Sequence, residues 1–221
     1  VALTKKLDAA AAQIKAGRLV TTAALDRILD KTARADLERR WLVTDTSTWY
    51  PLSEEPHRHI SQAIERMAVK DYKGAAAEVC RVSAYLRLES ARAVGDAKAG
   101  LVAADSQLHS AASRLDRGVA TSERSLSRTL AHADHALAIA HQARAAEAWS
   151  RKAYDQAGYE IKAAATSLRG AAEHANEETR RIAHAASAQA QALGDKLVSG
   201  GVWTRDEVAQ GFEALRHGLD A

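Results

Sequence analysis

A long alanine-rich stretch between Thr121 and Leu193 limits this chain to helical folds. Apolar residues recur there every three or four positions, which places them on one face of an α-helix. The stretch is long enough for two helices, and the strongest turn signal lies near Lys152 and Tyr154. We therefore predict two antiparallel helices joined by a turn at Ala153, because short connections favour antiparallel neighbours.

An earlier stretch matches this hairpin when the chain is shifted by 82 positions, the distance from His59 to His141. Further pairs that coincide at this shift are Glu65 and Glu147, Met67 and Trp149, Lys70 and Lys152, Tyr72 and Tyr154, Glu78 and Glu160, and Leu86 and Leu168. A fixed spacing of this kind is typical of an internal duplication. The sequence thus predicts two related helical hairpins, 54–116 and 121–195, in one elongated antiparallel bundle.

Composition favours helices over sheets. Hydrophobic residues make up 47% of the 221 residues, which suffices for a core, whereas aromatic residues make up only 5%. Alanine is the commonest apolar residue, as in closely packed helices, while sheets favour β-branched and aromatic side chains. No apolar run reaches the roughly 18 residues of a membrane-spanning helix. We expect an all-α protein without a transmembrane segment.

The N-terminal part, 1–52, differs from the rest. The spacing of its apolar residues predicts amphipathic helices at 2–16 and 22–40. The run 41–51 is rich in β-branched and aromatic residues, so we expect it to be an extended crossover or one short strand.

The central part, 53–197, is the predicted bundle. Its four long helices are expected at 54–69, 72–115, 121–151 and 155–193. Gly194 follows the last of these as a stop signal. Beyond a hinge at the adjacent glycines Gly200 and Gly201, Thr204 and Glu207 fit a capping box. Residues 198–221 are therefore expected to hold an amphipathic helix, 204–219, that docks on the bundle or on a partner.

The sequence contains nine histidines, which are its main candidates for metal ligands. His132 and His135 are three residues apart and so share one helix face, a spacing that suits two metal ligands. His174 lies as far after the turn at Ala153 as His132 lies before it, which places both at one level of the hairpin. These three histidines are the predicted metal ligands. Solvated or hydrogen-bonding histidines are the alternative, because no Glu-x-x-His motif accompanies them.

The repeat-related histidines His59 and His141 lie nearer the apolar positions of their helices. One hypothesis gives both a structural role as buried hydrogen-bond partners. The other lets them bind a haem or metal ion between the hairpins. Trp41, Trp49 and Tyr50 either plug the end of the bundle or line a pocket for such a ligand. The cofactor is therefore left open, with a divalent metal and haem as the candidates.

Several function classes are disfavoured. The sequence has no glycine-rich phosphate loop and no nucleophile elbow, so we expect no enzymatic activity. Its 31 basic and 28 acidic residues are interspersed rather than gathered in a stripe, which predicts no nucleic-acid partner. The single cysteine, Cys80, cannot form an intramolecular disulfide or a cysteine-based zinc site.

Two main hypotheses for function follow. The first is a non-enzymatic interaction or scaffold protein that binds a protein partner or assembles into a homo-oligomer, since alanine-rich helices bury more surface on association. The alternative is a periplasmic binding protein for a metal ion, haem or small apolar ligand. Contact with a membrane surface through amphipathic helices is a third hypothesis. Because the chain begins at Val1 rather than at methionine, we favour a periplasmic or secreted location over a cytoplasmic one.

Overall fold

The computed structural model describes residues 56–221, apart from Ala120 and His174. All described residues belong to one compact unit, 52–221. Every regular element among them is a helix, which confirms the all-α class for this part of the chain. The predictions for 1–52, including Trp41, Trp49 and Tyr50, lie outside the described residues.

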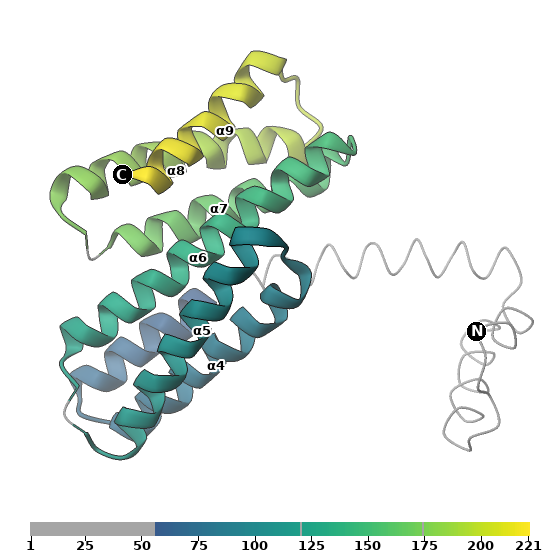
Figure 1. Ribbon diagram of the computed structural model, residues 1–221. Coiled ribbons are helices and arrows are strands. Elements are labelled where there is room, and N and C mark those ends of the chain that lie inside the picture. The colour runs from purple at the N-terminus through teal and green to yellow at the C-terminus, as the bar shows by residue number, and fades with distance from the viewer. Residues whose placement is uncertain (1–55, 120, 174) are drawn as a thin grey trace, which may run out of the picture. The chain divides into compact units, whose positions relative to one another are not determined.

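Seven stretches of helix follow one another along the described chain (Figure 1). They are the helical residues 56–68, α4 (Tyr72–Arg92), α5 (Gly95–Asp116), α6 (Glu123–Ser150), α7 (Tyr154–Ala172), α8 (Glu177–Val198) and α9 (Arg205–Asp220). From α4 onward, each helix packs mainly on the helices before and after it in the chain. We call 56–68, α4 and α5 the first trio, and α6, α7 and α8 the second trio.

Two of the predicted long helices are interrupted, so the predictions of unbroken helices at 72–115 and 155–193 are wrong. The first interruption lies at Ala93 and Val94, both of which are extended, and Gly95 has a φ of +57°. The second lies between α7 and α8, where the Asn176 side chain accepts a hydrogen bond from the Thr179 backbone N–H. Each repeated stretch therefore contains three helices rather than a hairpin of two.

The predicted turn at Ala153 is present, and the turn at Asp71, between the predicted helices 54–69 and 72–115, shares its geometry. Lys70 and Lys152 both adopt a left-handed conformation with a φ of 61°. At the first turn the Asp71 N–H donates to the Arg66 carbonyl over 2.8 Å, and at the second the Ala153 N–H donates to the Ala148 carbonyl over 2.9 Å. This hydrogen bond across five residues satisfies a carbonyl at the helix end, as in a Schellman motif.

Further landmarks recur at the same offset of 82 residues. Gly118 and Gly200 end α5 and α8 with φ values of 66° and 68°. Helix starts coincide as well: α4 begins at Tyr72 and α7 at Tyr154, α5 at Gly95 and α8 at Glu177, and α6 at Glu123 and α9 at Arg205. The start of α9 thus lies 82 positions after the start of α6.

Gly194 does not end a helix as predicted; it lies inside α8, where α7 and α8 come close together. A Cβ atom added to Gly194 would lie 2.9 Å from the Gly158 carbonyl oxygen, and one added to Gly158 would lie 2.9 Å from the Gly194 carbonyl oxygen. Only glycine leaves room for the two backbones to approach this closely. The counterparts in the first trio, Ala76 and Ala112, are both buried alanines.

The core consists of small aliphatic side chains arranged in two adjoining clusters. The first joins the first trio to the start of α6 around Leu86, Leu101 and Leu137, and the second joins the rest of α6 to α7, α8 and α9. Leu215 of α9 is fully buried in the second cluster, with the side chains of Trp203 and Phe212 packed against it. The C-terminal helix therefore docks on α8, and its start carries the predicted capping box of Thr204 and Glu207.

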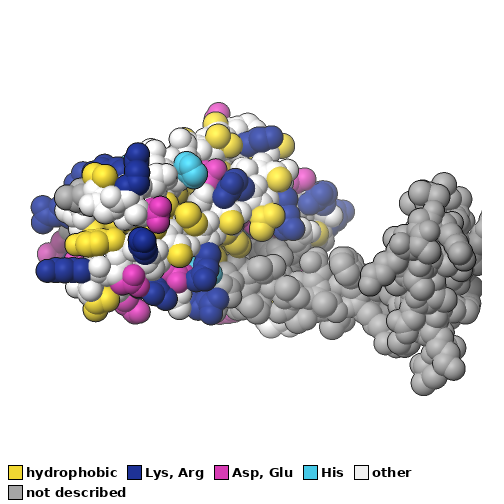
Figure 2. All heavy atoms as spheres, turned by 90° about the horizontal axis from the view of Figure 1, so that it is seen from below, with side chains coloured by type: hydrophobic (Ala, Val, Ile, Leu, Met, Phe, Trp, Pro, Cys, Tyr) yellow, Lys and Arg dark blue, Asp and Glu magenta, His cyan; other side chains and the backbone are white. Residues whose placement is uncertain are grey.

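The described part of the chain contains no helix that is both long and apolar enough to cross a membrane. Its helices instead alternate buried and exposed positions, as amphipathic helices do. The face shown in Figure 2 carries Lys and Arg side chains interspersed with Asp and Glu, and scattered apolar side chains lie between them. The charges are thus mixed on this face, in agreement with their distribution along the sequence.

Candidate functional site

A buried group of charged side chains lies where α4, α6 and α7 meet. His141 of α6 is only 3% exposed, and its Nδ1 atom lies 2.8 Å from Oε2 of Glu160 on α7. The same nitrogen lies 2.8 Å from Nη2 of Arg144. When Nδ1 carries the proton it donates to the carboxylate, and when it does not it accepts from the guanidinium.

Arg144 connects the two trios electrostatically. Its Nε donates to Oε1 of Glu160 over 3.0 Å, and its Nη2 lies 2.5 Å from Oε2 of the buried Glu89 on α4. Burial alone would lower the pKa of Arg144, but the charges of Glu160 and Glu89 raise it above its ordinary value. Burial also raises the pKa of the nearby Tyr85 hydroxyl, and the charge of Glu89 adds to this effect. Arg144 therefore stays a cation that compensates two buried carboxylates.

The first trio contains the counterpart of this group. Nδ1 of His59 lies 2.7 Å from Oε2 of Glu78, as His141 lies against Glu160. Arg81 donates to the other oxygen of Glu78 over 2.6 Å, and Arg66 lies 3.4 Å from that oxygen. Burial opposes ionisation of Glu78, but the hydrogen bonds from Arg81 and His59 hold its pKa below its ordinary value. Both repeat-related histidines thus face a buried carboxylate.

The sequence left two roles open for His59 and His141, as buried hydrogen-bond partners or as ligands of a haem or metal ion. Each imidazole points Nδ1 at a glutamate, the orientation that fixes the tautomer of the ring. Neither histidine lines the groove between α5 and α6, the groove between α8 and α9 or the groove around Gly170 of α7. Trp41, Trp49 and Tyr50, the other predicted ligand contacts, lie outside the described residues. Haem or metal binding at these histidines stays a prediction, whereas the geometry supports their structural role.

The predicted metal ligands are only partly described. Nδ1 of His132 lies 3.3 Å from Oε1 of Gln107 on α5, and His135 is half-buried one turn further along α6. Burial lowers the pKa of His135, and the neighbouring His132 lowers it further. His174 lies outside the described residues. Among those that are described, no three His, Cys, Asp or Glu side chains form a group that could hold a metal ion.

Sequence reasoning missed a further pair, His57 and Asp134. Nδ1 of His57 lies 3.2 Å from Oδ1 of Asp134, which is almost fully buried, and Nε2 of His57 is buried without a hydrogen-bond partner in the described part of the chain. Gly170 makes room for this pair, because a Cβ there would lie 2.4 Å from Asp134 Oδ2. The signal was present: Asp134 lies between Leu130 and Leu137 on the apolar face of α6, where a carboxylate requires a partner.

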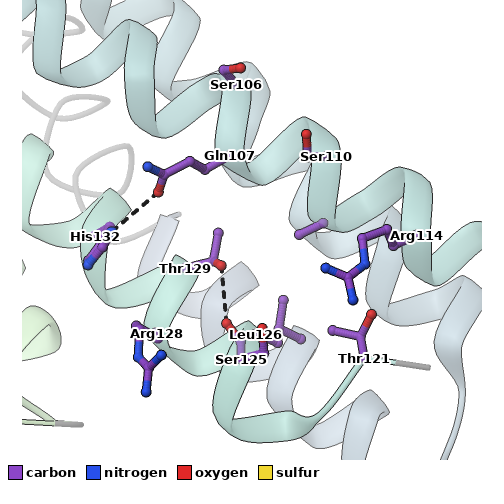
Figure 3. A pocket seen from close by; sticks show the side chains of 11 residues that line it. Ser106, Gln107, Ser110, Arg114, Thr121, Ser125, Leu126, Arg128, Thr129 and His132 are labelled. Carbon is purple, nitrogen blue, oxygen red and sulfur yellow. Dashed lines mark hydrogen bonds between the residues drawn. The ribbon is translucent and has the colours of Figure 1, made fainter. Parts of the chain in front are cut away.

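An open groove of about 390 Å³ lies between the second half of α5 and the first half of α6 (Figure 3). Arg114 extends from α5 toward the start of α6, and Arg128 and His132 come from α6. The other polar lining residues are Ser106, Gln107, Ser110, Thr121, Ser125 and Thr129. The groove therefore carries basic and neutral polar groups, and none of its lining residues is acidic.

Among the described residues, exposed large apolar side chains are more numerous on the first trio than on the second, and two others, Val119 and Val202, lie in the connections that follow α5 and α8. Val69, Leu88, Val94 and Val102 are 75%, 64%, 81% and 53% exposed. Their counterparts in the second trio, in the same order, are Arg151, Gly170, Asn176 and His184. The two trios thus share a fold but differ in the polarity of corresponding surface positions.

No protein-family model matches the chain, and no curated protein or solved structure matches it either. The geometry of the described residues is thus the basis for assigning a function. It offers three features: the buried carboxylate and histidine groups, the basic groove and the apolar surface of the first trio.

Proposed function

We propose that this protein is a non-enzymatic helical interaction protein, built from duplicated three-helix units, that self-associates through the first trio. The apolar surface of the first trio is the observation that carries this proposal. Apolar side chains occupy positions at which the second trio has a charged, polar or glycine residue. Contiguous exposed apolar surface marks sites of protein contact, and three of these side chains follow one another along the chain: Leu88 near the end of α4, Val94 between the two helices and Val102 in the first half of α5.

Val94 supports a role for these side chains in binding. It occupies the N-cap position of α5 and provides no side-chain hydrogen bond, whereas its counterpart Asn176 caps α8. Replacing a capping residue with an apolar one costs a helix about 1 kcal/mol. An exposed valine at this position is therefore unfavourable for the isolated chain, and contact with another protein surface would offset that cost.

The second trio indicates what kind of element covers this surface. On α7, the groove around Thr166 and Gly170 is lined from the other side by Ile60 and Ile64 of the helical residues 56–68. Gly170 is the counterpart of Leu88 on α4. A helix thus already packs against this face in one trio, and we infer that a helix of a second copy packs against the same face in the other.

Duplication makes such an assembly reasonable on physical grounds. In repeat proteins each unit contacts mainly its neighbours, so units can stack across copies as they do within one chain. Burying apolar surface contributes roughly 25 cal/mol per Å² removed from water. Contacts between different surfaces of identical chains continue until a ring closes or a filament forms.

Sedimentation velocity of the full chain over a range of concentrations tests this proposal. We expect reversible association, and we expect Leu88→Glu and Val102→Glu to shift the chain toward monomer because each buries a charge in the interface. His184→Glu is the matched control, since residue 184 is the exposed counterpart of Val102 on α8. That variant should associate like the unmodified protein.

Self-association is wrong if the unmodified chain sediments as a monomer at every concentration. The assignment to the first trio is wrong if the chain associates but His184→Glu weakens association as much as Val102→Glu does. Circular dichroism of each variant should show unchanged helicity, because all three substitutions lie at exposed positions of helices.

A further inference from the structure

One face of α4 carries small and apolar side chains at helical spacing. They are Ala77, Cys80, Ala84, Leu88 and Ala91, all of which are exposed. Steps of three and four residues keep side chains on one face of a helix, as in the contact between two packed helices. We call these five residues the α4 seam. Leu88, which is 64% exposed, also belongs to the apolar surface described above.

The spacing of the α4 seam is the same in both directions from its centre. Cys80 and Leu88 are each four residues away from the central Ala84, and Ala77 and Ala91 are each seven residues away. A two-fold axis at Ala84 therefore places the seams of two antiparallel copies of α4 against each other, with Ala77 of one copy at the level of Ala91 of the other. Such a surface is complementary to itself, which a two-fold dimer requires.

The corresponding face of α7 packs against a helix. At the offset of 82 residues, the counterparts of Ala84, Leu88 and Ala91 are Thr166, Gly170 and Glu173. All three counterparts line the groove beside the helical residues 56–68, and a Cβ atom on Gly170 would lie 3.4 Å from Nδ1 of His57 in that helix. The second trio thus receives a helix on this face, whereas the same face of α4 is exposed.

The charges beside the α4 seam are compensated within the chain. Arg81 and Arg87 flank the seam, three residues on either side of Ala84. Nη1 of Arg81 donates to Oε1 of Glu78 over 2.6 Å, and Nε of Arg87 lies 3.7 Å from Oδ1 of Asp105. Two seams can therefore meet without bringing unpaired like charges together. Alanine at the centre allows the two helix axes to approach to roughly 8 Å, the short end of helix-packing distances.

We propose that α4 of one copy packs against α4 of a second copy, antiparallel and around a two-fold axis at Ala84. This pairing rests on the proposed self-association through the first trio, to which it adds the helix, the register and the symmetry. Because both copies use the same surface, association ends at a dimer. Each Cys80 then lies at the level of Leu88 of the other copy, so the two Cys80 residues are about 12 Å apart along the helices at ~1.5 Å rise per residue.

Disulfide crosslinking of the full chain tests this register. In a Cys80→Ala background, Ala84→Cys places two thiols at the two-fold axis, where their Cα atoms lie within the roughly 7 Å that a disulfide can span. On mild oxidation we expect a disulfide-linked dimer to form at least about tenfold faster than with Ala188→Cys in the same background, because pairing holds the thiols at a millimolar effective concentration. Ala188 is the matched control, since it is an exposed alanine on α8. The unmodified chain is the register control, because its Cys80 thiols are too far apart to join within the pair.

Sedimentation velocity under reducing conditions separates the register from self-association itself. We expect the unmodified chain to reach a dimer and no larger species. Ala84→Glu should raise the dissociation constant about tenfold or more, because it places two carboxylates side by side on the axis. Ala188→Glu should leave the dissociation constant unchanged.

A chain that associates while Ala84→Cys crosslinks no faster than Ala188→Cys would overturn the α4 pairing and leave the proposed self-association in place. Equally fast crosslinking through Cys80 of the unmodified chain would overturn the register at Ala84. Species larger than a dimer would overturn the two-fold symmetry. A chain that stays monomeric would overturn both the pairing and the proposed function.

Discussion

At the scale of single residues, Arg144 has the largest effect that the structure allows us to predict. Its side chain compensates Glu89 and Glu160, and all three lie at the contact between the two trios. Removing one partner of a buried ion pair is costly because an uncompensated charge stays in the interior. Arg144 acts on two carboxylates at once, so its loss affects both trios.

We predict that Arg144→Met lowers the free energy of unfolding by about 3–5 kcal/mol, the usual cost of leaving a buried charge unpaired. Urea denaturation followed by circular dichroism measures this change. Arg124→Met is the control, since Arg124 is exposed and forms no ion pair with the described residues; it should stay within about 0.5 kcal/mol of the unmodified protein. Equal stability of the two variants would show that the charged group contributes little.

A second prediction concerns the ionisation of His135. Burial and the charge of His132 lower its pKa below the ordinary 6.5, while Asp220 opposes them. The unfolded imidazole therefore takes up a proton at a higher pH than the folded one does. Stability is fully present above pH 6.5 and falls as the pH decreases through that value toward the folded pKa.

Titration of the histidine ring protons by nuclear magnetic resonance measures this effect. The midpoint of His135 should lie below 6.5. In the His132→Ala variant it should move upward, because a neighbouring positive charge is removed, but burial should keep it below the ordinary value. A midpoint that does not respond to His132→Ala would contradict the assigned cause.

At the scale of elements, the turns at Lys70 and Lys152 determine where the second helix of each trio begins. Both lysines are left-handed, a conformation that costs a residue with a Cβ atom but costs glycine nothing. The sequence nevertheless repeats lysine at both turns, so the cost is present twice. Substitution with glycine should remove it.

We predict that Lys152→Gly raises the free energy of unfolding by up to about 1 kcal/mol, because the native φ of 61° suits glycine. The same substitution at the exposed Lys98, inside α5, should lower it by about 1 kcal/mol, as glycine usually does in a helix interior. Chemical denaturation of both variants gives the comparison. Opposite signs support the turn geometry, and destabilisation by both substitutions contradicts it.

These elements also show which signals the sequence contained. The turn at Ala153, the capping box at Thr204 and the start of α4 were predicted because each depends on residues close together in the chain. The break at Val94 was not predicted, because Val94 and Ala93 carry no capping side chain and the apolar spacing continues across them, although the adjacent Gly95 was a local sign that the helix could bend there. Gly194 was misread as a stop because its role depends on the approach of Gly158 from another helix.

At the scale of the whole described unit, the offset of 82 residues was visible in the sequence. The side-chain contacts that form within and between the related stretches were not. The pairs His59 with Glu78 and His141 with Glu160 were both contained in the predicted alignment, and the structure brings each pair together. Arg144 was missed because its partner Glu89 lies far away in the sequence, and only tertiary packing joins them. The basic groove likewise required knowing which helices are neighbours.

The first trio exposes apolar side chains at positions where the second trio has polar, charged or glycine residues. A protein that worked as an isolated monomer would gain little from exposing Leu88, Val94 and Val102. Second copies that cover these side chains would give them a function and would leave the polar surface of α8 in water. Association should therefore protect the apolar surface of the first trio from solvent and leave the exposed surface of α8 unchanged.

Hydrogen–deuterium exchange of the unmodified chain at low and high concentration tests whether the chain self-associates through the first trio. We predict slower exchange at high concentration in peptides that span Leu88 to Val102, because a second copy covers them on association, and no change in peptides from α8, whose polar surface stays in water. Exchange that is independent of concentration throughout the chain, or protection that appears on α8 instead, would contradict self-association through the first trio.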